Sequence, residues 1–285
     1  IVLYSYCNNL MKKVSSYRLL REKQFSEITD NFTHIKFSNL IACHKIDRKL
    51  FNKLKKESEK FLNISKKYNL SNMTPNGKLM PKRENEKIFN NIVTIYRDII
   101  MSLNFAHLIK KWVVPAIRYK ESNTNKLNLK RSSRTELPHS DSWAGWGDSC
   151  ILVQIPILGD IKNNRVDYYE IPSDLKKDWM KEIKFDKAKK FVSKCKKLKH
   201  HYKSGYIYIC DISVVHSTKR LRDSKPRMSI DIPLILKSTN NINKKFKSDI
   251  ISNNKINLLN KKYKINCPVK MGKISEKPIS FKYIK

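Results

Sequence analysis

The chain has 285 residues, 40% of them apolar, and only 6 glycines and 10 prolines, so one buried core is expected and low-complexity disorder is not its main character. Its 6 cysteines form no CxxC pair, which argues against a disulfide framework or a zinc site and favours a cytoplasmic location. The formal net charge of +35 comes mainly from lysines spread along the whole length. That spread fits a bias toward A/T-rich codons at least as well as it fits a nucleic-acid surface, so nucleic acid is not the expected partner.

Residues 1–114 are predicted to be mainly helical and to pack on the core. Residues 1–10 are apolar, but the basic residues follow them, which is the wrong order for a secretory signal and makes Met11 a candidate initiator. Residues 11–48 indicate short mixed elements. Apolar residues at helical spacing predict helices over 49–68 and 85–111. No membrane span is expected, because charged residues interrupt the most apolar stretch.

From residue 115 the sequence changes to short runs rich in branched and aromatic residues. These runs are AIRYK, RTELPHSD, CILVQIPIL, RVDYYEI, GYIYICD, SVVHST and RMSIDIPLIL. Polar residues and Pro separate them, which predicts a mainly β core over 115–236, arranged as a sandwich or jelly roll. A Lys-rich stretch, 173–201, predicts a helical insert whose His200-His201 pair lies at the surface. Residues 237–285 are rich in Lys and Asn and predict a loosely packed C-terminal extension.

Three residues in the β region are candidate metal ligands. If residues 137–141 are extended, His139 and Asp141 point from the same face of the strand. His216, in the run SVVHST, would complete a facial set of two imidazoles and one carboxylate, which leaves three positions of an octahedral iron(II) open. Taken singly, each piece has an ordinary interpretation, since an HxD occurs by chance in roughly a third of such chains and a His in an apolar run is more often a core residue.

Arg227 and Ser229 form a second candidate pair downstream of His216. They alternate with apolar residues and therefore share one face of a predicted strand. The polar loop LRDSKP would let this strand lie beside the His216 strand. A planar guanidinium grips a carboxylate through two hydrogen bonds, and a Ser hydroxyl adds a third. The alternative is that Arg227 forms a structural ion pair with Asp231 or Asp211.

The order His139-x-Asp141, His216, Arg227-x-Ser229 resembles the iron(II)/2-oxoglutarate-dependent dioxygenase superfamily. Within it, PHSDSWAGWGDS followed by ILVQIPIL is similar to a phytanoyl-hydroxylase-related branch typified by a streptomycin-biosynthesis oxygenase. The resemblance covers about residues 115–236. It implies a double-stranded β-helix (a jelly-roll or cupin-like core), iron(II) on the three ligands, and 2-oxoglutarate and O2 as cosubstrates. It also implies that Arg227 and Ser229 bind the distal carboxylate of 2-oxoglutarate.

The resemblance also implies a reaction class. Related halogenases replace the metal-binding carboxylate with a small residue, so Asp141 favours hydroxylation or desaturation of a small polar metabolite. One alternative is a nucleic-acid demethylase of the same superfamily, which would gather Lys and Arg around the mouth of the site. The other is a non-enzymatic jelly-roll binding module, in which the three ligands would not converge. The sequence departs from many members at Ser204-Gly205, where they carry Gly-Asp.

Four further residues are weaker candidates. Gln154 would face the cosubstrate, or else bond to backbone as an inward-pointing residue of its strand. Trp143 and Trp146 would wall the substrate pocket, although core or lid packing explains them equally well. Arg118 would contact an anionic substrate.

Overall fold

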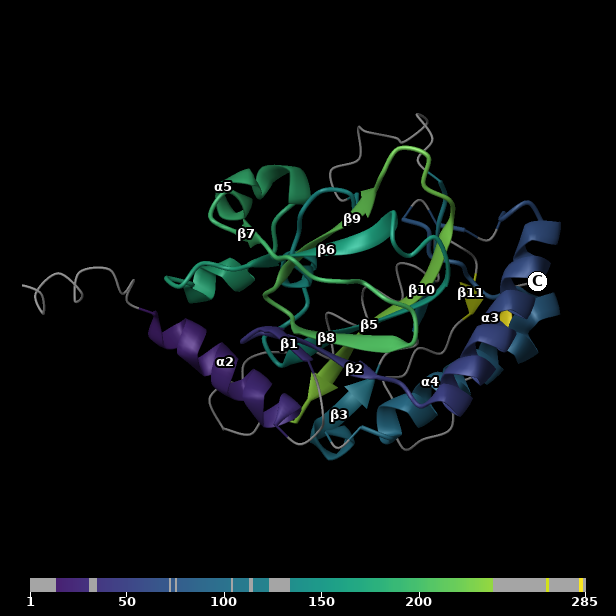
Figure 1. Cartoon of the computed structure of the whole chain (residues 1–285), viewed down its shortest axis with the longest axis horizontal. Coiled ribbons are helices and arrows are strands. Elements are labelled where there is room, and N and C mark those ends of the chain that lie inside the picture. Colours follow the sequence, from purple (N-terminus) through teal and green to yellow (C-terminus); the bar gives the residue numbers. More distant parts are fainter. Residues whose placement is uncertain are drawn as a thin grey trace, which may run out of the picture.

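The structure is a computed structural model that describes residues 14–30, 35–71, 73–74, 76–103, 105–112, 115–122, 134–237, 265–266 and 282–283. Its centre is a pair of antiparallel β-sheets that face each other (Figure 1). The helices α3 and α4 lie beside the larger sheet at one end of this view, and α2 lies at the other end. The predicted loosely packed extension over 237–285 lies almost wholly outside the described residues, and the candidate initiator Met11 lies outside them.

The larger sheet has seven strands. Its order is β1 (Ile35–Ser38), β2 (Ile41–Lys45), β8 (Tyr206–Asp211), β5 (Cys150–Gly159), β10 (Arg227–Leu236) and β3 (Ile109–Trp112), with β4 (Ala116–Lys120) also paired to β10. The smaller sheet has the order β7 (Lys196–Lys197), β6 (Asn164–Glu170) and β9 (Val215–Arg220). A separate two-stranded pair joins β11 (Ile265–Asn266) to β12 (Lys282–Tyr283).

The chain passes repeatedly between the two sheets after β4. Strand β5 lies in the larger sheet and β6 in the smaller one, β8 lies in the larger and β9 in the smaller, and β10 returns to the larger. This alternation between facing antiparallel sheets is the winding of a jelly roll, or double-stranded β-helix. The predicted fold class is therefore confirmed.

Strand β5 explains the long apolar run CILVQIPIL. It lies between β8 and β10 in the middle of the larger sheet, and residues 150–157 are all buried. Helix α3 (Arg48–Lys67) contacts β5 on one face, and the other face looks between the sheets. Because both faces are covered, the strand shows no alternation of apolar and polar residues.

Helices α3 and α4 (Glu86–Met101) pack against each other outside the larger sheet. Helix α3 begins at Asp47, whose side chain accepts a hydrogen bond from the Leu50 N–H at 3.0 Å. The rings of Phe61 and Phe89 join the two helices, with centroids 5.6 Å apart. The predicted helix over 85–111 is wrong beyond Met101, because residues 109–112 form β3 against β10, and this pairing overrides helical propensity.

The first 114 residues also contain strands that the sequence did not indicate. Strand β2 pairs with β8, placing Ile41 opposite Cys210, and β1 extends the sheet beyond β2. Helix α2 (Ser16–Thr29) is capped by Ser15, whose hydroxyl accepts from the Arg18 N–H at 3.1 Å. The N-terminal region thus supplies three strands of the larger sheet in addition to its helices.

The stretch 173–201 was predicted to be a helical insert, and this is wrong for most of its length. It holds two 3-10 turns, η4 (Lys177–Met180) and η5 (Phe185–Lys187), a four-residue helix α5 (Lys189–Val192), and β7, which pairs with β6. Of its large apolar residues, Trp179, Met180 and Phe185 are buried, whereas Phe191 and Val192 are only half-buried, and no continuous apolar face supports a longer helix. Within the described ranges, no helix has the length and apolar character that crossing a membrane requires.

Candidate metal centre

His139, Asp141 and His216 lie together between the two sheets. Their ligand atoms, one from each residue, are all within 4.8 Å of one another. His139 and His216 exchange two backbone hydrogen bonds, from the His139 N–H to the His216 carbonyl at 2.9 Å and the reverse at 2.8 Å. This bridge fixes the two imidazole rings with centroids 4.5 Å apart. The sequence-predicted ligands are therefore brought to one point.

The local backbone around Asp141 differs from the extended strand that was expected. Asp141 is the first residue of a 3-10 turn, η3 (Asp141–Ala144), and Ser140 caps it by accepting from the Ser142 N–H at 3.2 Å. The carboxylate reaches the two imidazoles by this turn and not by strand alternation. A Ser that caps its own chain two residues on competes with a strand, which is the physical reason for the difference.

The surroundings of both imidazoles favour a free Nε2. His139 Nδ1 lies 2.7 Å from the Leu137 carbonyl oxygen, and His216 Nδ1 lies 3.4 Å from that of Val214. An Nδ1–H donated to a carbonyl leaves Nε2 unprotonated and able to bind a metal. Burial lowers the pKa of His139 well below its usual value, and the nearby His216 adds to this. The neutral form that a metal requires is thus favoured.

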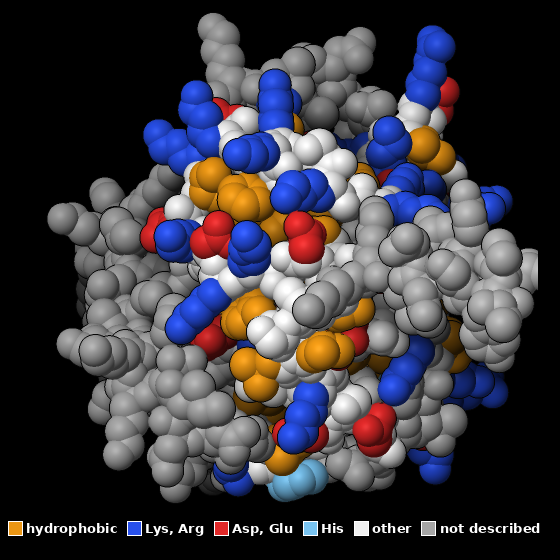
Figure 2. Space-filling model, turned by 90° about the vertical axis from the view of Figure 1, so that its left-hand side faces the viewer, with side chains coloured by type: hydrophobic (Ala, Val, Ile, Leu, Met, Phe, Trp, Pro, Cys, Tyr) orange, Lys and Arg blue, Asp and Glu red, His pale blue; other side chains and the backbone are white. Residues whose placement is uncertain are grey.

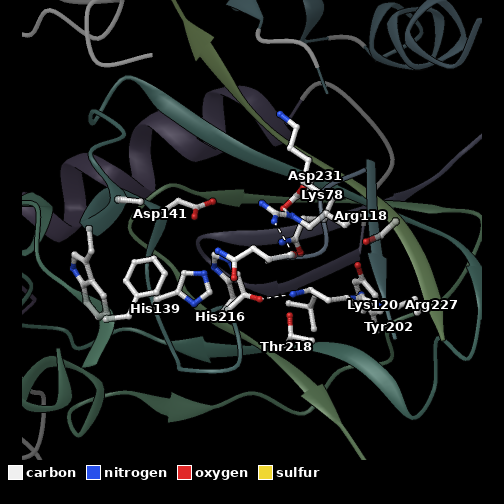
Figure 3. A pocket seen from close by; sticks show the side chains of 18 of the residues that line it. Lys78, Arg118, Lys120, His139, Asp141, Tyr202, His216, Thr218, Arg227 and Asp231 are labelled. Carbon is white, nitrogen blue, oxygen red and sulfur yellow. Dashed lines mark hydrogen bonds and ion pairs between the residues drawn. The ribbon is translucent and has the colours of Figure 1, made fainter. Parts of the chain in front are cut away.

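The three candidate ligands line one side of a cavity of about 530 Å³ (Figure 3). The opposite side is formed by Lys120, Arg227 and Tyr202, and Arg118 with Asp231 lies between the two groups. Around the metal-ligand side the lining is partly apolar. It includes Trp143, Ala144, Ile183 and Phe185, the last stacked on the His139 ring at 4.2 Å between centroids.

Arg227 lies at the start of β10 with its side chain 2% exposed, and it takes no part in either expected ion pair. Asp231 pairs with Arg118 at 2.5 Å, and Asp211 pairs with Arg21. Among the described residues, Nε and Nη1 of Arg227 have no hydrogen-bond partner, and the Arg227 guanidinium carbon lies 5.4 Å from the centre of the Tyr202 ring. The structural ion-pair alternative for Arg227 is therefore wrong.

Lys120 is a candidate residue that the sequence did not single out. It lies directly opposite Arg227 in the β4–β10 register, and its side chain is 5% exposed. The ammonium donates to the Thr135 hydroxyl at 2.6 Å and lies 3.7 Å from a Glu136 carboxylate oxygen. Burial, opposed in part by Glu136, lowers the pKa of Lys120 to about 7. The alternation in AIRYK, which places Arg118 and Lys120 on one face, was the available signal.

The remaining predicted residues occupy different environments. Ser229 lines the cavity on the same face of β10 as Arg227. Gln154 also lines it, but accepts from the Tyr168 hydroxyl, so the expected backbone partner is wrong. Trp143 lines the cavity while its indole N–H donates to the Trp179 carbonyl at 2.8 Å.

Trp146, by contrast, is buried but is not among the described residues that line the cavity. Arg118 lines it and also lies 3.2 Å from the Asn76 carbonyl oxygen, in addition to its pairing with Asp231. His200, expected at the surface, is half-buried with Nε2 2.9 Å from the Val166 carbonyl oxygen, because β7 carries it under β6; His201 is exposed as expected.

Comparison with known proteins is informative only at the level of structure. No family model and no curated protein matches the chain. Similar solved structures include AviO1 from Streptomyces viridochromogenes (12% identity, 75% of this chain and 96% of that one, TM-score 0.43). They also include the alpha-ketoglutarate-dependent carbocyclase SnoK (10% identity, 75% of this chain and 83% of that one, TM-score 0.43). A third is a prolyl hydroxylase from Trichoplax adhaerens (9% identity, 78% of this chain and 93% of that one, TM-score 0.42).

The SnoK structure is that of a non-heme, alpha-ketoglutarate-dependent enzyme. Likenesses this distant carry no weight for reaction or substrate. The chemistry rests on the residues themselves. Two buried imidazoles and one carboxylate, whose ligand atoms lie within 4.8 Å of one another at the wall of a cavity, have the residue types of the facial set that binds non-heme iron(II) and could hold a metal ion.

Proposed function

We propose that this protein is an iron(II)- and 2-oxoglutarate-dependent oxygenase that hydroxylates or desaturates a small polar metabolite. The observation that carries the proposal is the presence of two complementary sites in one cavity. One is the ligand set of His139, Asp141 and His216, and the other is the buried cation pair Lys120 and Arg227. A metal ion held by the ligand set and a carboxylic acid held by the cation pair would therefore lie in the same cavity.

The residues present fit both groups. Neutral imidazole and carboxylate together suit iron(II), and the set leaves positions open for further ligands. The orphaned Nε and Nη1 of Arg227 show that the protein itself does not satisfy this guanidinium. With iron(II) and 2-oxoglutarate bound, the site would supply oxidation of a substrate C–H bond by O2, with conversion of 2-oxoglutarate to succinate and carbon dioxide.

The protein's own residues have distinct roles in this proposal. Arg227 and Lys120 bind the distal carboxylate of the cosubstrate, and the Ser229 hydroxyl adds a hydrogen bond. Phe185 and Trp143 exclude water beside the ligands. Asp141 supplies the carboxylate whose presence favours hydroxylation or desaturation over halogenation.

The distribution of charge supports a small-molecule substrate over nucleic acid. The described cavity lining has five basic and three acidic residues: Lys78, Arg118, Lys120, Lys184 and Arg227 against Asp141, Glu182 and Asp231. Lys and Arg outnumber Asp and Glu more strongly in the whole chain, 60 to 25. On the face drawn in Figure 2, Lys and Arg are spread among acidic and apolar side chains. Positive charge is thus not concentrated at the site.

The direct test is aerobic incubation of the purified protein with iron(II), 2-oxoglutarate and fractionated metabolite pools. We expect succinate formation, together with a metabolite that gains one oxygen atom or loses two hydrogens. The matched control is His216→Ala, which removes one candidate ligand. Equal succinate formation by wild type and His216→Ala would refute the proposed metal site.

A further inference from the structure

We propose that Arg21, on the N-terminal helix α2, is a positioning residue for the metal ligands, acting through Asp211 and the turn that follows it. The inference rests on the proposed function, because it concerns the same ligand set. It adds a residue from outside the β core to the metal centre. It also gives helix α2 a role beyond covering the end of the sheets.

Arg21 and Asp211 form a fully enclosed, two-point ion pair. Their side chains are 3% and 2% exposed. The Arg21 Nε donates to Asp211 Oδ1 at 3.2 Å, and Nη2 donates to Oδ2. Nη1 donates to the Asp148 carbonyl and, at 3.0 Å, to Gln24 Oε1. The guanidinium is thus held in one orientation, and a bidentate pair of this kind transmits that orientation to the carboxylate.

The Asp211 carboxylate shapes the turn that leads into the His216 strand. Its Oδ1 accepts from the Ser213 N–H at 2.9 Å and from the Ser213 hydroxyl at 2.5 Å. The Val214 N–H closes the turn on the Asp211 carbonyl at 3.0 Å. The Val214 carbonyl then faces the His216 imidazole. Arg21 therefore fixes a carboxylate whose hydrogen bonds set the backbone just before a metal ligand.

The same turn holds the other ligand-bearing segment. The Ile212 carbonyl accepts from the Ser140 hydroxyl at 2.8 Å, and Ser140 lies between His139 and Asp141 as the cap of η3. The Ser213 carbonyl accepts from the Trp179 indole N–H at 2.9 Å, and Trp179 in turn packs on Trp143. A displacement of this turn would thus reach all three ligands together.

The main alternative is that the pair only anchors helix α2. The chain contains a matched case, because Arg18 on the same helix is also buried. It pairs with Glu170 and with Glu22, and it donates to the Ile171 carbonyl. Glu170 and Ile171 lie at the end of β6 and directly after it, and among the hydrogen bonds of the described residues they make no contact with the turn at Asp211 or with Ser140. Loss of either pair loosens α2, but only loss of the Arg21 pair releases the ligand segments.

The test compares two double variants that each remove both members of an ion pair, so that no fully buried charge is left alone and only the partly exposed Glu22 loses its contact with Arg18. Arg21→Gln with Asp211→Asn is compared with Arg18→Gln with Glu170→Gln. Co(II) is titrated anaerobically into the full-length chain and followed by calorimetry and visible absorption, and a melting curve is recorded for each protein. We expect both variants to melt earlier. Only the Arg21 variant should bind Co(II) about tenfold more weakly and show an altered absorption band, since loss of a group that orients the metal ligands costs about 10- to 100-fold in metal affinity.

The outcomes separate this inference from the proposed function. Failure of the wild type to bind Co(II) would refute the metal site itself. Normal wild-type binding, with equal Co(II) affinity in the two double variants, would overturn the positioning role of Arg21 alone. If the Arg21 variant does not fold, Ser213→Ala takes its place, because it removes the hydroxyl hydrogen bond, one of the two by which Ser213 joins the Asp211 carboxylate to the turn, and leaves the ion pair intact. Unchanged Co(II) affinity in Ser213→Ala would equally overturn the inference.

Discussion

Lys120 and Arg227 face each other directly across the β4–β10 ladder, so two buried cations occupy one cross-strand pair. Like charges at directly opposed positions destabilise a sheet. Glu136 lies near Lys120 but also pairs with Arg220, so it offsets only part of this repulsion. An acid bound between the two side chains would relieve it. The arrangement indicates that the pair is kept for binding and not for stability.

The first prediction concerns Arg227. Arg227→Lys keeps the charge but loses the planar fork, so the Michaelis constant for 2-oxoglutarate should rise. Loss of one charge-assisted hydrogen bond costs about 1.5–3 kcal/mol, or roughly ten- to a hundredfold in affinity. Titrating 2-oxoglutarate against both proteins measures this. A lowered melting temperature with an unchanged titration would remove Arg227 from the binding site.

The second prediction sets stability against binding at Lys120. Lys120→Met keeps the length of the side chain and removes a buried charge, so the free energy of unfolding should increase by about 1 kcal/mol, a rise of about 2–4 °C in Tm. Binding of 2-oxoglutarate should weaken at the same time. A variant that melts earlier than wild type, or that binds 2-oxoglutarate equally well, would contradict the role given to this lysine.

The third prediction follows from the pKa of Lys120, which burial lowers to about 7. A carboxylate bound beside the ammonium raises that pKa, so binding takes up a proton at pH values above 7. The dissociation constant of 2-oxoglutarate should be flat below about pH 7 and rise above it by up to about tenfold per pH unit. Comparing wild type with Lys120→Met from pH 6 to 9 isolates this lysine, because the metal ligands titrate in both. If the dissociation constants of wild type and Lys120→Met change with pH in parallel, the prediction is refuted.

The ligand set could be predicted from residue order, but its local geometry could not. His139, Asp141, His216 and Arg227 stand in an order that few chains show by accident, and the structure brings them to one cavity. The extended conformation expected at Asp141 was wrong because the cap at Ser140 starts a 3-10 turn. Ser140 is a residue type that commonly caps such turns, so the sequence itself contained a signal for this turn.

Strand pairing was the part that the sequence did not specify. The strands of His216 and Arg227 were expected side by side, yet β9 and β10 lie in opposite sheets, because the loop between them crosses the sandwich. The roles of Lys120 and Arg21 depend on partners far along the chain, which no local pattern marks. Short strands such as β2 form because an edge of the larger sheet is available to them.

The fourth prediction concerns Gly159, which ends β5 opposite Arg227 with a φ of +88°. A Cβ there would overlap the Pro226 carbonyl, whereas at Gly205, with a φ of +82°, the nearest atom would be Phe51 Cδ1 at 4.0 Å. In both Ala variants the left-handed backbone should lower the free energy of unfolding by roughly 1–2 kcal/mol. Gly159→Ala should lose more stability than Gly205→Ala and also raise the Michaelis constant for 2-oxoglutarate, because it displaces the start of β10. Equal losses in the two melting curves would show that the Pro226 contact is unimportant.

The fifth prediction separates the role of Asp141 in metal binding from any role in folding. Asp141 is half-buried, and within the described residues its side chain takes part in no ion pair. Asp141→Ala should therefore leave the melting temperature of the metal-free protein nearly unchanged. Loss of a ligand should weaken Co(II) binding by more than the roughly 10- to 100-fold that follows the loss of a group orienting the ligands, and it should abolish succinate formation.

Asp141→Asn is the matched control for this change, because it keeps the size and one oxygen donor while removing the negative charge. We expect it to bind Co(II) more tightly than Asp141→Ala and more weakly than wild type, since a neutral amide oxygen is a poorer ligand than a carboxylate. Calorimetric titration with Co(II) and a melting curve of each metal-free protein measure both effects. Full succinate formation by Asp141→Ala would mean that the metal is held elsewhere, whereas a large fall in melting temperature without loss of metal affinity would make Asp141 a structural residue.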